Sequence, residues 1–341
     1  MKRLLILLLS ATLLLAGCGQ VAQPEKQQYT ATFLELFDTV TTVIGREYSE
    51  EAFQAKAQAV RDDLQYYHQL FDIYNDYEGV ANIKTINDNA GIAPVTVDPV
   101  ILTFLLDCKD YYADTHGKVN VAMGSMLQLW HVARNDGLRD PSQAKLPNEE
   151  QLAQAATHTA IDCIEIDEGN ATVFITDPAA RLDVGAIAKG WATQRVAENA
   201  PEGLLISVGG NVCATGPKLE DGTPWVIGIQ DPEDSQQNLH TLYLTNGSVV
   251  TSGDYQRAYV VDGQKYHHII DPETLMPATN WRSVSVVCAD SGLADALSTG
   301  LFLMDLEQGK QLAQEYGAEV LWVDRNGNEF MTAGLSSLLR N

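Results

Sequence analysis

The second half of the chain is dominated by short segments in which apolar and polar residues alternate, and this pattern limits the fold more than any other feature. From Ile161 onward these segments read CIEID, TVFI, LLISVGG, WVIGIQ, LYLTN, SVVTSG, YVVDG and SVSVVC. The turn dipeptides Asp221-Gly222, Asn246-Gly247, Asp262-Gly263 and Asn326-Gly327 lie among them. Alternation with a period of two predicts half-buried strands, and these dipeptides favour tight turns between antiparallel neighbours. The sequence therefore predicts a mainly antiparallel sheet or sheets.

Helices are predicted before and between these strands. Residues 33–47 are rich in β-branched and aromatic residues and predict one strand, whereas apolar residues at three- and four-residue spacing predict a helix from Ser49 to about Phe71. Further helices are predicted over 98–112, near 149–156, over 185–199 and over 291–304, with a polar excursion at 135–150. The fold class is therefore α+β, with helices flanking the sheet.

The N-terminus has the pattern of an export signal. Lys2 and Arg3 precede an apolar run of about 13 residues, which is shorter than the roughly 20 that a membrane span needs. The run ends in Leu-Ala-Gly-Cys, which resembles a bacterial lipobox, so residues 1–17 are expected to be a lipoprotein signal peptide and Cys18 the lipidated N-terminus. Residues 18–30 would form a flexible tether, and 31–341 a single domain or two packed subdomains.

The charge and cysteine content narrow the function classes. Removing residues 1–17 takes away two basic residues and no acidic ones, which moves the formal net charge from −23 to −25. Such a surface argues against nucleic acid or anionic lipid as a partner through charge attraction. The cysteines after Cys18 form no CxxC pair, so neither a zinc site nor a disulfide framework is indicated. No GxGxxG or GxxxxGK[ST] motif occurs.

The first stretch that could carry chemistry is RLDVGAIAKGWATQRVAE, residues 181–198. Gly185 and Gly190 permit close approach of the backbone, and Lys189 lies at the start of the predicted helix. Exposed N–H groups with a nearby ammonium suit a phosphate or another anion. Alternatively, the glycines relieve crowding and the lysine reaches water. Taken by itself, this stretch favours the second interpretation.

The second stretch is SGLADALSTGLFLM, residues 291–304. Asp295 and Thr299 are four residues apart, so they share one face of an otherwise apolar helix. A buried carboxylate needs a partner, and a hard cation such as Mg²⁺ accepts carboxylate, hydroxyl, carbonyl and phosphate oxygens. The alternative is a threonine bonded to the carbonyl four residues back, with Asp295 acting as a cap or paired to an arginine.

The third stretch is VVTSGDYQRAYVVDGQKYHHIIDP, in which His267 and His268 lie before an Asp-Pro break. A histidine at this place could relay a proton. It could equally fix the loop through hydrogen bonds, which is the more common role of a single histidine.

Together these stretches resemble the ApbE family of FAD:protein FMN transferases. The segments LDVGAIAKGWA, SVGGNVCATG, TSGDYQR, YHHIIDPETLMP and ADALSTGLFLM occur in the family's order and approximate spacing. Weaker matches at FDTVTT, FDIYN, TIND and GKVNVAMGSMLQLW extend the resemblance over nearly all of residues 33–335. Each segment is weak by itself, but five in order are specific.

The resemblance implies a reaction and a set of site residues. FAD would bind with its diphosphate on Mg²⁺, a threonine hydroxyl of an acceptor flavoprotein would attack the phosphorus on the FMN side, and AMP would leave. The Asp295 carboxylate, the Thr299 hydroxyl and the Ala186 carbonyl would hold the metal, and His268 would position or deprotonate the threonine. The residues expected to contact FAD are Phe37, Tyr74, Lys118, Val119, Asn120, Asp183, Lys189, Gly209, Gly210, Ser252 and Ile269.

The chain departs from the family pattern at two places. The usual Met-Gly-Thr is Phe37-Asp38-Thr39, and the usual Gly-Ala-Phe-Asp is Gly117-Lys118-Val119-Asn120. Both segments line the flavin end of the family's site. Two other functions stay open at this stage, an Mg²⁺-dependent FAD pyrophosphatase and a lipoprotein that binds flavin or another solute without turnover. The expected location is the outer face of the cytoplasmic membrane or the periplasmic side, where acceptors would be exported or membrane redox proteins.

Overall fold

The computed structural model describes residues 25–340, and its centre is an eight-stranded sheet. The strand order is β1-β2-β6-β7-β10-β13-β14-β15, and every neighbouring pair is antiparallel. The strands of this sheet are β1 (Gln27–Phe33), β2 (Thr41–Glu47), β6 (Leu204–Val208), β7 (Asn211–Ala214), β10 (Gly247–Gly253), β13 (Trp281–Cys288), β14 (Glu319–Asp324) and β15 (Glu329–Met331). The predicted α+β class with mainly antiparallel pairing is confirmed.

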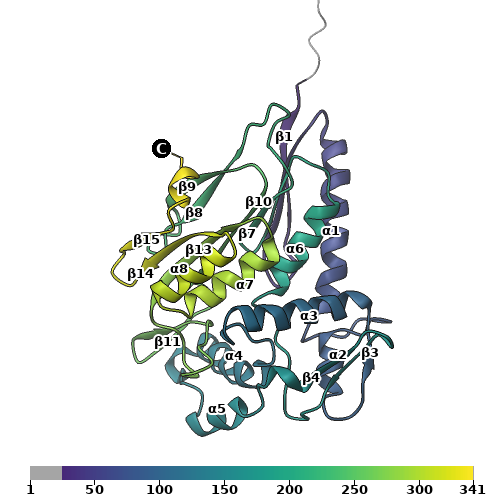
Figure 1. The fold of residues 1–341 in the computed structure, drawn as a ribbon, viewed down its shortest axis with the longest axis vertical. Helices are drawn as coiled ribbons and strands as arrows, with labels where there is room; N and C mark the ends of the chain where they lie inside the picture. Colours follow the sequence, from purple (N-terminus) through teal and green to yellow (C-terminus); the bar gives the residue numbers. More distant parts are fainter. Residues whose placement is uncertain (1–24, 341) are drawn as a thin grey trace, which may run out of the picture.

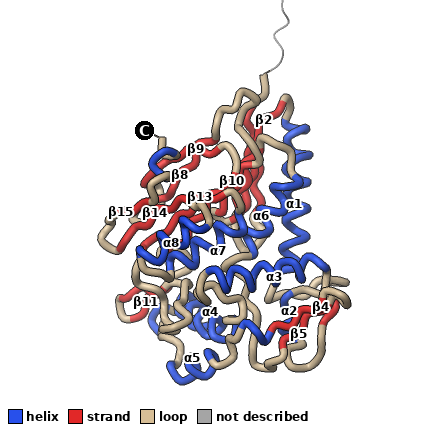
Figure 2. The backbone as a smooth tube through the Cα atoms, in the orientation of Figure 1, coloured by secondary structure: helices blue, strands red, loops and turns tan. Residues whose placement is uncertain are grey.

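Helices cover one face of this sheet (Figures 1 and 2). They are α1 (Glu50–Phe71), α6 (Ala188–Asn199), α7 (Ser291–Phe302) and α8 (Leu306–Glu315). The hairpin of β8 (Trp225–Gln230) and β9 (Asn238–Leu244) packs against the opposite face, where its buried side chains meet those of β10, β13 and β14. Of the predicted tight turns, Asp262-Gly263 connects the paired strands β11 and β12, and Asn326-Gly327 connects β14 and β15. Asn246-Gly247 instead joins β9 to β10, which belongs to the eight-stranded sheet and does not pair with β9.

The remaining elements form a second layer of structure in the lower half of Figure 1. They are α2 (Ile83–Asp88), α3 (Pro99–Asp114), α4 (Gly124–Arg139), α5 (Glu149–Ala156), the small sheet β3 (Val95–Thr96), β5 (Thr172–Ile175) and β4 (Ile164–Asp167), and the hairpin of β11 (Tyr259–Val261) and β12 (Gln264–Tyr266). Short 3₁₀ turns occur at 141–143, 161–163 and 335–337. No helix of residues 25–340 is both long enough and apolar enough to span a bilayer.

Local sequence explains why most of the helices lie where they do. Ser49 caps α1 by accepting a hydrogen bond from the Ala52 N–H, and Asp98 caps α3 in the same way with Pro99 in the first turn. The predicted helices at 149–156 and 291–304 correspond to α5 and α7. The helix predicted from 185 begins instead at Ala188, and α4 continues to Arg139 into the segment predicted as an excursion.

Two predictions near the N-terminus are wrong. Residues 33–47 do not form one strand, because Phe37 and Asp38 adopt left-handed φ angles of 52° and 50° and turn the chain between β1 and β2. The tether predicted to reach residue 30 ends earlier, because Gln27–Phe33 pairs along its whole length with β2. The predicted signal peptide and Cys18 lie outside the described residues.

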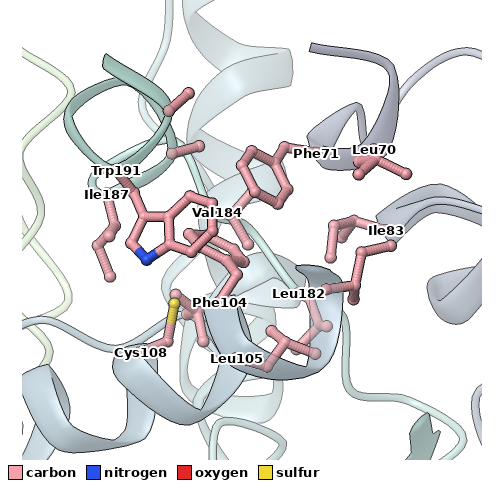
Figure 3. Close-up of a cluster of buried hydrophobic side chains, with 14 of the residues drawn as sticks. Leu70, Phe71, Ile83, Phe104, Leu105, Cys108, Leu182, Val184, Ile187 and Trp191 are labelled. Carbon is pink, nitrogen blue, oxygen red and sulfur yellow. The ribbon is translucent and has the colours of Figure 1, made fainter. Parts of the chain in front are cut away.

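A buried aromatic cluster fixes the start of α6 (Figure 3). Trp191 of α6 packs edge-on against Phe71 of α1 and Phe104 of α3, with ring centroids 5.6 and 5.4 Å away. Ile187 and Val184, just before the helix, are buried in the same cluster. The three helices therefore hold Lys189 and the preceding loop at a defined position.

Candidate active site

One cavity of about 570 Å³ collects most of the residues predicted to bind or act. Its walls come from the end of α1, the 118–123 loop, α4, the start of α6, the end of β10, the His268 segment and α7. The predicted residues that line it are Phe37, Tyr74, Lys118, Val119, Asn120, Asp183, Ala186, Lys189, Gly209, Ser252, His268, Ile269, Asp295 and Thr299. This volume is within the range that small-molecule sites occupy.

A close contact between α6 and α7 builds one end of the cavity. Gly190 faces Asp295, and a Cβ atom on this glycine would lie 2.4 Å from the Asp295 Cβ and 2.4 Å from the Ser291 carbonyl oxygen. The Gly190 N–H donates to Asp295 Oδ2 at 2.8 Å, and Lys189 Nζ lies 3.5 Å from the same oxygen. Lys189 also donates to the Gly185 carbonyl at 2.9 Å. A side chain at position 190 would therefore push α6 and α7 apart where Lys189 and Asp295 meet.

The oxygen atoms at this end suit a hard divalent cation. Asp295 is only 4% exposed, and burial raises the pKa of its carboxyl although Lys189 and the Gly190 N–H favour the charged form. Thr299 and Ala186 border the same space. Within residues 25–340 no group of three His, Cys, Asp or Glu side chains could hold a metal ion by itself. A cation here would thus use one carboxylate with hydroxyl, carbonyl and substrate oxygens, which is the ligand set that Mg²⁺ accepts.

The alternative interpretation of Asp295 and Thr299 does not describe this structure. Asp295 pairs with a lysine and not with an arginine, and it does not cap its helix. Among the described residues the Thr299 hydroxyl makes no hydrogen bond to the carbonyl of Asp295, whereas Ser298 does, at 3.0 Å. Ser298 in turn shares a hydrogen bond of 2.8 Å with Ser252, so these two hydroxyls support the wall behind Asp295.

The two neighbouring histidines have different surroundings. His267 is 3% exposed; its Nδ1 accepts a hydrogen bond from the Ile269 N–H, which leaves Nε2 to donate to the Ala278 carbonyl at 2.8 Å. His268 lines the cavity, and its buried Nδ1 has no hydrogen-bond partner within residues 25–340. Burial, followed by the nearby Arg257, lowers the pKa of His268 to about 3. His267 therefore fixes the segment, and His268 presents a neutral imidazole to the cavity.

The opposite end of the cavity is more aromatic. The Phe37 N–H donates to His68 Nδ1 at 3.2 Å, which holds the left-handed turn after β1. The Tyr74 hydroxyl lies 3.3 Å from His131 Nδ1, and His131 Nε2 lies 3.8 Å from Asp183 Oδ2. Tyr74 lines the cavity and is 58% exposed, so its side chain lies where the cavity opens to solvent.

The residues of the 118–120 segment line the cavity, but two of their side chains are engaged within the protein. Lys118 Nζ lies 3.2 Å from Asp271 and 2.8 Å from Glu273. The Asn120 amide donates to the Thr159 carbonyl at 2.8 Å, and its oxygen accepts from the Ala122 N–H at 2.9 Å. In this arrangement both polar groups hold the loop.

Of the two glycines predicted to contact the cofactor, Gly209 and Gly210, only Gly209 lines the cavity. Gly209 lines the cavity, and a Cβ there would lie 2.7 Å from the Thr39 hydroxyl oxygen. Gly210 does not line the cavity; it has a φ of 93°, a Cβ on it would meet no atom within 4 Å, and it serves the tight turn between β6 and β7. The expected contact of Gly210 with the cofactor is therefore not supported.

Sequence reasoning missed several polar residues that line the cavity. Those that could contact a ligand are His131, Arg134, Asn135, Asn211, Gln256 and Arg257. His131 and Arg134 are three residues apart and therefore project from one side of α4. The sequence alone could have predicted that His131 and Arg134 share one side of a helix. It could not have predicted that α4 and residues 256–257 line the same cavity.

A cavity lined by a buried carboxylate paired with a lysine, and by a neutral histidine, has the kinds of group that enzymes acting on phosphate-containing substrates use. The model of the ApbE family matches residues 37–322, and the chain belongs to this family. The resemblance inferred from the motifs is thereby confirmed.

Relatives and solved structures agree with this assignment. A Treponema pallidum protein named FAD:protein FMN transferase is 31% identical over 277 residues, covering 76% of this chain and 75% of its own. A Klebsiella pneumoniae protein of the same name is 32% identical over 269 residues, covering 76% and 81%. The structure of an ApbE protein from Thermotoga maritima aligns with a TM-score of 0.81 at 29% identity over 92% of this chain and all of the other. Flavin transferase ApbE from Vibrio cholerae, at 24% identity and a TM-score of 0.74, shares the fold.

Proposed function

We propose that this chain is an FAD:protein FMN transferase that uses Mg²⁺ and a threonine hydroxyl of an acceptor flavoprotein. The threonine oxygen forms a bond to the phosphorus on the FMN side of FAD, and the bond from that phosphorus to the bridging oxygen breaks. AMP leaves with the bridging oxygen, and the hydroxyl proton passes to the protein. The observation that carries this proposal is that Asp295, Thr299, Lys189 and His268 border one cavity.

The end of the cavity formed by α6 and α7 would take the diphosphate. Asp295, Thr299 and the Ala186 carbonyl would hold Mg²⁺, which when bound would neutralise charge that develops on the phosphoryl oxygens. Lys189 would keep its ammonium beside Asp295 and add a second positive charge at the same end. The short contact at Gly190 keeps both groups at a fixed separation, which is what a preorganised charge site requires.

His268 would act on the acceptor threonine. Its imidazole is neutral because burial and nearby cations hold its pKa far below neutrality, so it can accept a hydrogen bond or a proton from a hydroxyl. A bound diphosphate would partly cancel the field of Arg257 and Lys189 and raise the pKa of His268 towards the range useful for a general base. His267 would hold the orientation of this segment through its bonds to Ile269 and Ala278.

Tyr74 and Phe37 would contact the flavin end of FAD, and Ile269 and Ser252 would line its path. Lys118 and Asn120 would act there mainly by holding the loop, because their polar groups bind Asp271, Glu273, Thr159 and Ala122. The flavin ring would then meet backbone and the buried Val119 instead of a charged side chain.

The protein would work while anchored by lipid on Cys18 at the outer face of the cytoplasmic membrane or on the periplasmic side. Support comes from the basic, apolar and Leu-Ala-Gly-Cys pattern of residues 1–18 and from the strongly acidic composition. Its acceptors would be exported or membrane redox proteins, and nucleic acid would not be a partner.

A transfer assay tests the function. The full chain is incubated with FAD, Mg²⁺ and a candidate exported flavoprotein, and the acceptor is weighed by mass spectrometry while AMP is quantified. The expected result is an acceptor mass gain equal to FMN minus water, with one AMP per label, abolished by EDTA and by replacing the target threonine with alanine. AMP and unattached FMN without labelling would instead support a pyrophosphatase, and binding of FAD without any product would support a flavin-binding lipoprotein.

A further inference from the structure

A chain of hydrogen bonds lies behind the aromatic end of the cavity and takes no part in the reaction described above. It begins at the Phe37 N–H, which donates to His68 Nδ1 at 3.2 Å. His68 Nε2 lies 3.2 Å from the Tyr77 hydroxyl oxygen, and that hydroxyl donates to Asp72 Oδ2 at 2.7 Å. The chain thus runs from the turn after β1, through the last turn of α1, to the loop that follows α1.

Only one arrangement of protons satisfies this chain. The Phe37 N–H points at His68 Nδ1, so that nitrogen carries no proton and the imidazole proton lies on Nε2. The Tyr77 hydroxyl gives its single proton to Asp72, so its oxygen accepts from His68 Nε2. Burial and the hydrogen bond to Asp72 raise the pKa of Tyr77, which keeps this hydroxyl protonated at neutral pH. The Asp72 carboxylate therefore fixes the tautomer of His68.

The same carboxylate anchors the loop that carries Tyr74. Asp72 Oδ1 accepts from the N–H groups of Tyr74 and Asn75 at 2.6 and 3.1 Å, and Oδ2 accepts from the Asn75 side-chain amide at 2.9 Å. Asp72 is buried, which by itself would raise the pKa of its carboxyl, but the hydrogen bonds from Asn75, Tyr74 and Tyr77 outweigh burial and lower it. One ionised carboxylate therefore holds two walls of the cavity, the Tyr74 loop directly and the Phe37 turn through Tyr77 and His68.

The turn after β1 has a conformation that needs such support. Phe37 and Asp38 are consecutive residues with left-handed φ angles of 52° and 50°, which are strained for residues that have a Cβ atom. The pairing of β1 with β2 fixes both ends of this turn, and the bond to His68 Nδ1 holds its middle. The rings of Phe37 and His68 also meet edge-on, with their centroids 5.5 Å apart. Loss of the acceptor on His68 would therefore release Phe37 while the strands on either side stay paired.

We propose that His68 is a positioning residue for flavin recognition, oriented by Tyr77 and Asp72, and that it determines the affinity of the site for the flavin ring. The inference rests on the proposed function, in which Phe37 and Tyr74 contact the flavin end of FAD. His68 borders the cavity, but both of its ring nitrogens are engaged within the protein, so it acts through the position of Phe37. The chain of bonds would then affect the flavin half of FAD and leave the adenosine half unchanged.

Ligands that each carry one half of FAD test this inference. FAD, FMN and ADP are titrated onto the full chain in Mg²⁺, the flavins by fluorescence and ADP by calorimetry. His68→Leu removes both ring nitrogens and should weaken FAD and FMN binding about tenfold, as expected for the loss of a hydrogen bond, while ADP binding stays unchanged. In the transfer assay KM for FAD should rise by a similar factor, and kcat should change by less than about twofold.

Two amide variants separate the roles of the two nitrogens. Asparagine can present its oxygen near the place of Nδ1, so His68→Asn should keep most of the flavin affinity. Glutamine places its amide group near the position of Nε2, so His68→Gln should resemble His68→Leu. Tyr77→Phe leaves Nε2 without its acceptor and should weaken FMN binding about threefold, because Nδ1 is then protonated in part of the molecules. Tyr66→Phe is the matched control, because Tyr66 is also on α1, donates to Asp98 at 2.8 Å and does not line the cavity.

The outcomes distinguish positioning from a general structural role. Equal losses of FMN and ADP affinity in His68→Leu would overturn the inference, as would wild-type FMN affinity in that variant. If circular dichroism shows that His68→Leu is unfolded, the two amide variants decide, and equal FMN affinities of His68→Asn and His68→Gln would refute the role of Nδ1. If the wild-type chain binds FMN and ADP and labels no acceptor, the proposed function fails, whereas the positioning role is still decided by the binding data.

Discussion

Replacing Asp295 by asparagine separates the proposed role of this residue as a metal ligand from its effect on stability. Asparagine keeps the shape of the side chain and an oxygen that can accept the Gly190 N–H, but it removes the negative charge beside Lys189. If Asp295 is the carboxylate ligand of Mg²⁺, transfer at limiting Mg²⁺ should fall by about a hundredfold or more. The fold should be retained, because no large group is added or removed.

The expected change in stability follows from two opposing effects. At 3.5 Å the attraction between Lys189 Nζ and Asp295 Oδ2 is about 5 kcal/mol with an effective dielectric constant of 20. Desolvation of a buried carboxylate costs several kcal/mol as well, and here it outweighs the attraction, because the environment as a whole raises the pKa of Asp295 above 3.8. Removal of the charge should therefore leave the free energy of unfolding unchanged or raise it by about 1 kcal/mol, which is a shift of roughly 2 °C in Tm.

The pH dependence of the free energy of unfolding independently tests whether removing the charge of Asp295 stabilises the fold. A carboxyl whose pKa is raised in the folded state contributes stability below its unfolded pKa and loses it as the pH rises through the folded value. The difference between Asp295→Asn and wild type should consequently be largest near pH 7 and vanish as the pH falls towards 3.8. Both proteins are unfolded by urea in EDTA at several pH values, and transfer is measured against the Mg²⁺ concentration.

Asp290→Asn is the matched control, because this N-cap of α7 is on the same helix, does not line the cavity, and keeps a capping side chain as asparagine. It should transfer FMN at the wild-type rate. Wild-type turnover of Asp295→Asn at low Mg²⁺ would refute the ligand assignment. A loss of stability above about 3 kcal/mol would refute the argument that desolvation outweighs the ion pair.

Three further perturbations test other parts of the site. The pKa of His268 is lowered from 6.5 to about 3 in the fold, so the unfolded chain binds the proton more readily and wild-type stability should fall as the pH drops from 6.5 towards 3. His268→Gln should show a shallower loss in acid unfolding followed by circular dichroism, together with slow transfer. Gly190→Ala adds a Cβ 2.4 Å from Asp295 and should cost about 1–3 kcal/mol in urea unfolding while lowering transfer; a wild-type melting curve would mean that α6 and α7 separate easily. His267→Ala removes the bonds to Ile269 and the Ala278 carbonyl, so kcat should fall more than FAD affinity, and equal effects on both would contradict a positioning role.

The sequence predicted the parts of the fold that local interactions decide. The caps at Ser49 and Asp98 begin α1 and α3, and both helices extend close to their predicted ends. The β1–β2 turn was not readable, because Phe37 and Asp38 adopt left-handed φ angles without a glycine or proline to mark the turn. The polar residues of β1 likewise resemble a tether, and they become a strand only through pairing with β2.

The same distinction applies to the candidate site. The spacing of Asp295 and Thr299 already placed both on one helical face, and the structure brings both to the cavity. Arg134 and Arg257 line one cavity because α4 packs against β11. Gly137 and Tyr259, which meet there, are more than a hundred positions apart in sequence, and no local pattern encodes their contact. Site residues that share one helix can therefore be predicted from the sequence more readily than site residues that lie on different elements.

The residues of the 117–120 segment that differ from the family pattern have structural roles of their own. Lys118 and Asn120 replace an apolar and an acidic residue of the family pattern, but the structure uses both for internal bonds. Lys118 pairs with Asp271, three residues after His268, so the 118–120 segment is tied to the segment after β12 that carries His268. This pair is mostly shielded from solvent, so it is screened less than a surface ion pair. The contacts of Lys118 and Asn120 therefore fix the position of the 118–120 segment relative to the segment that carries His268.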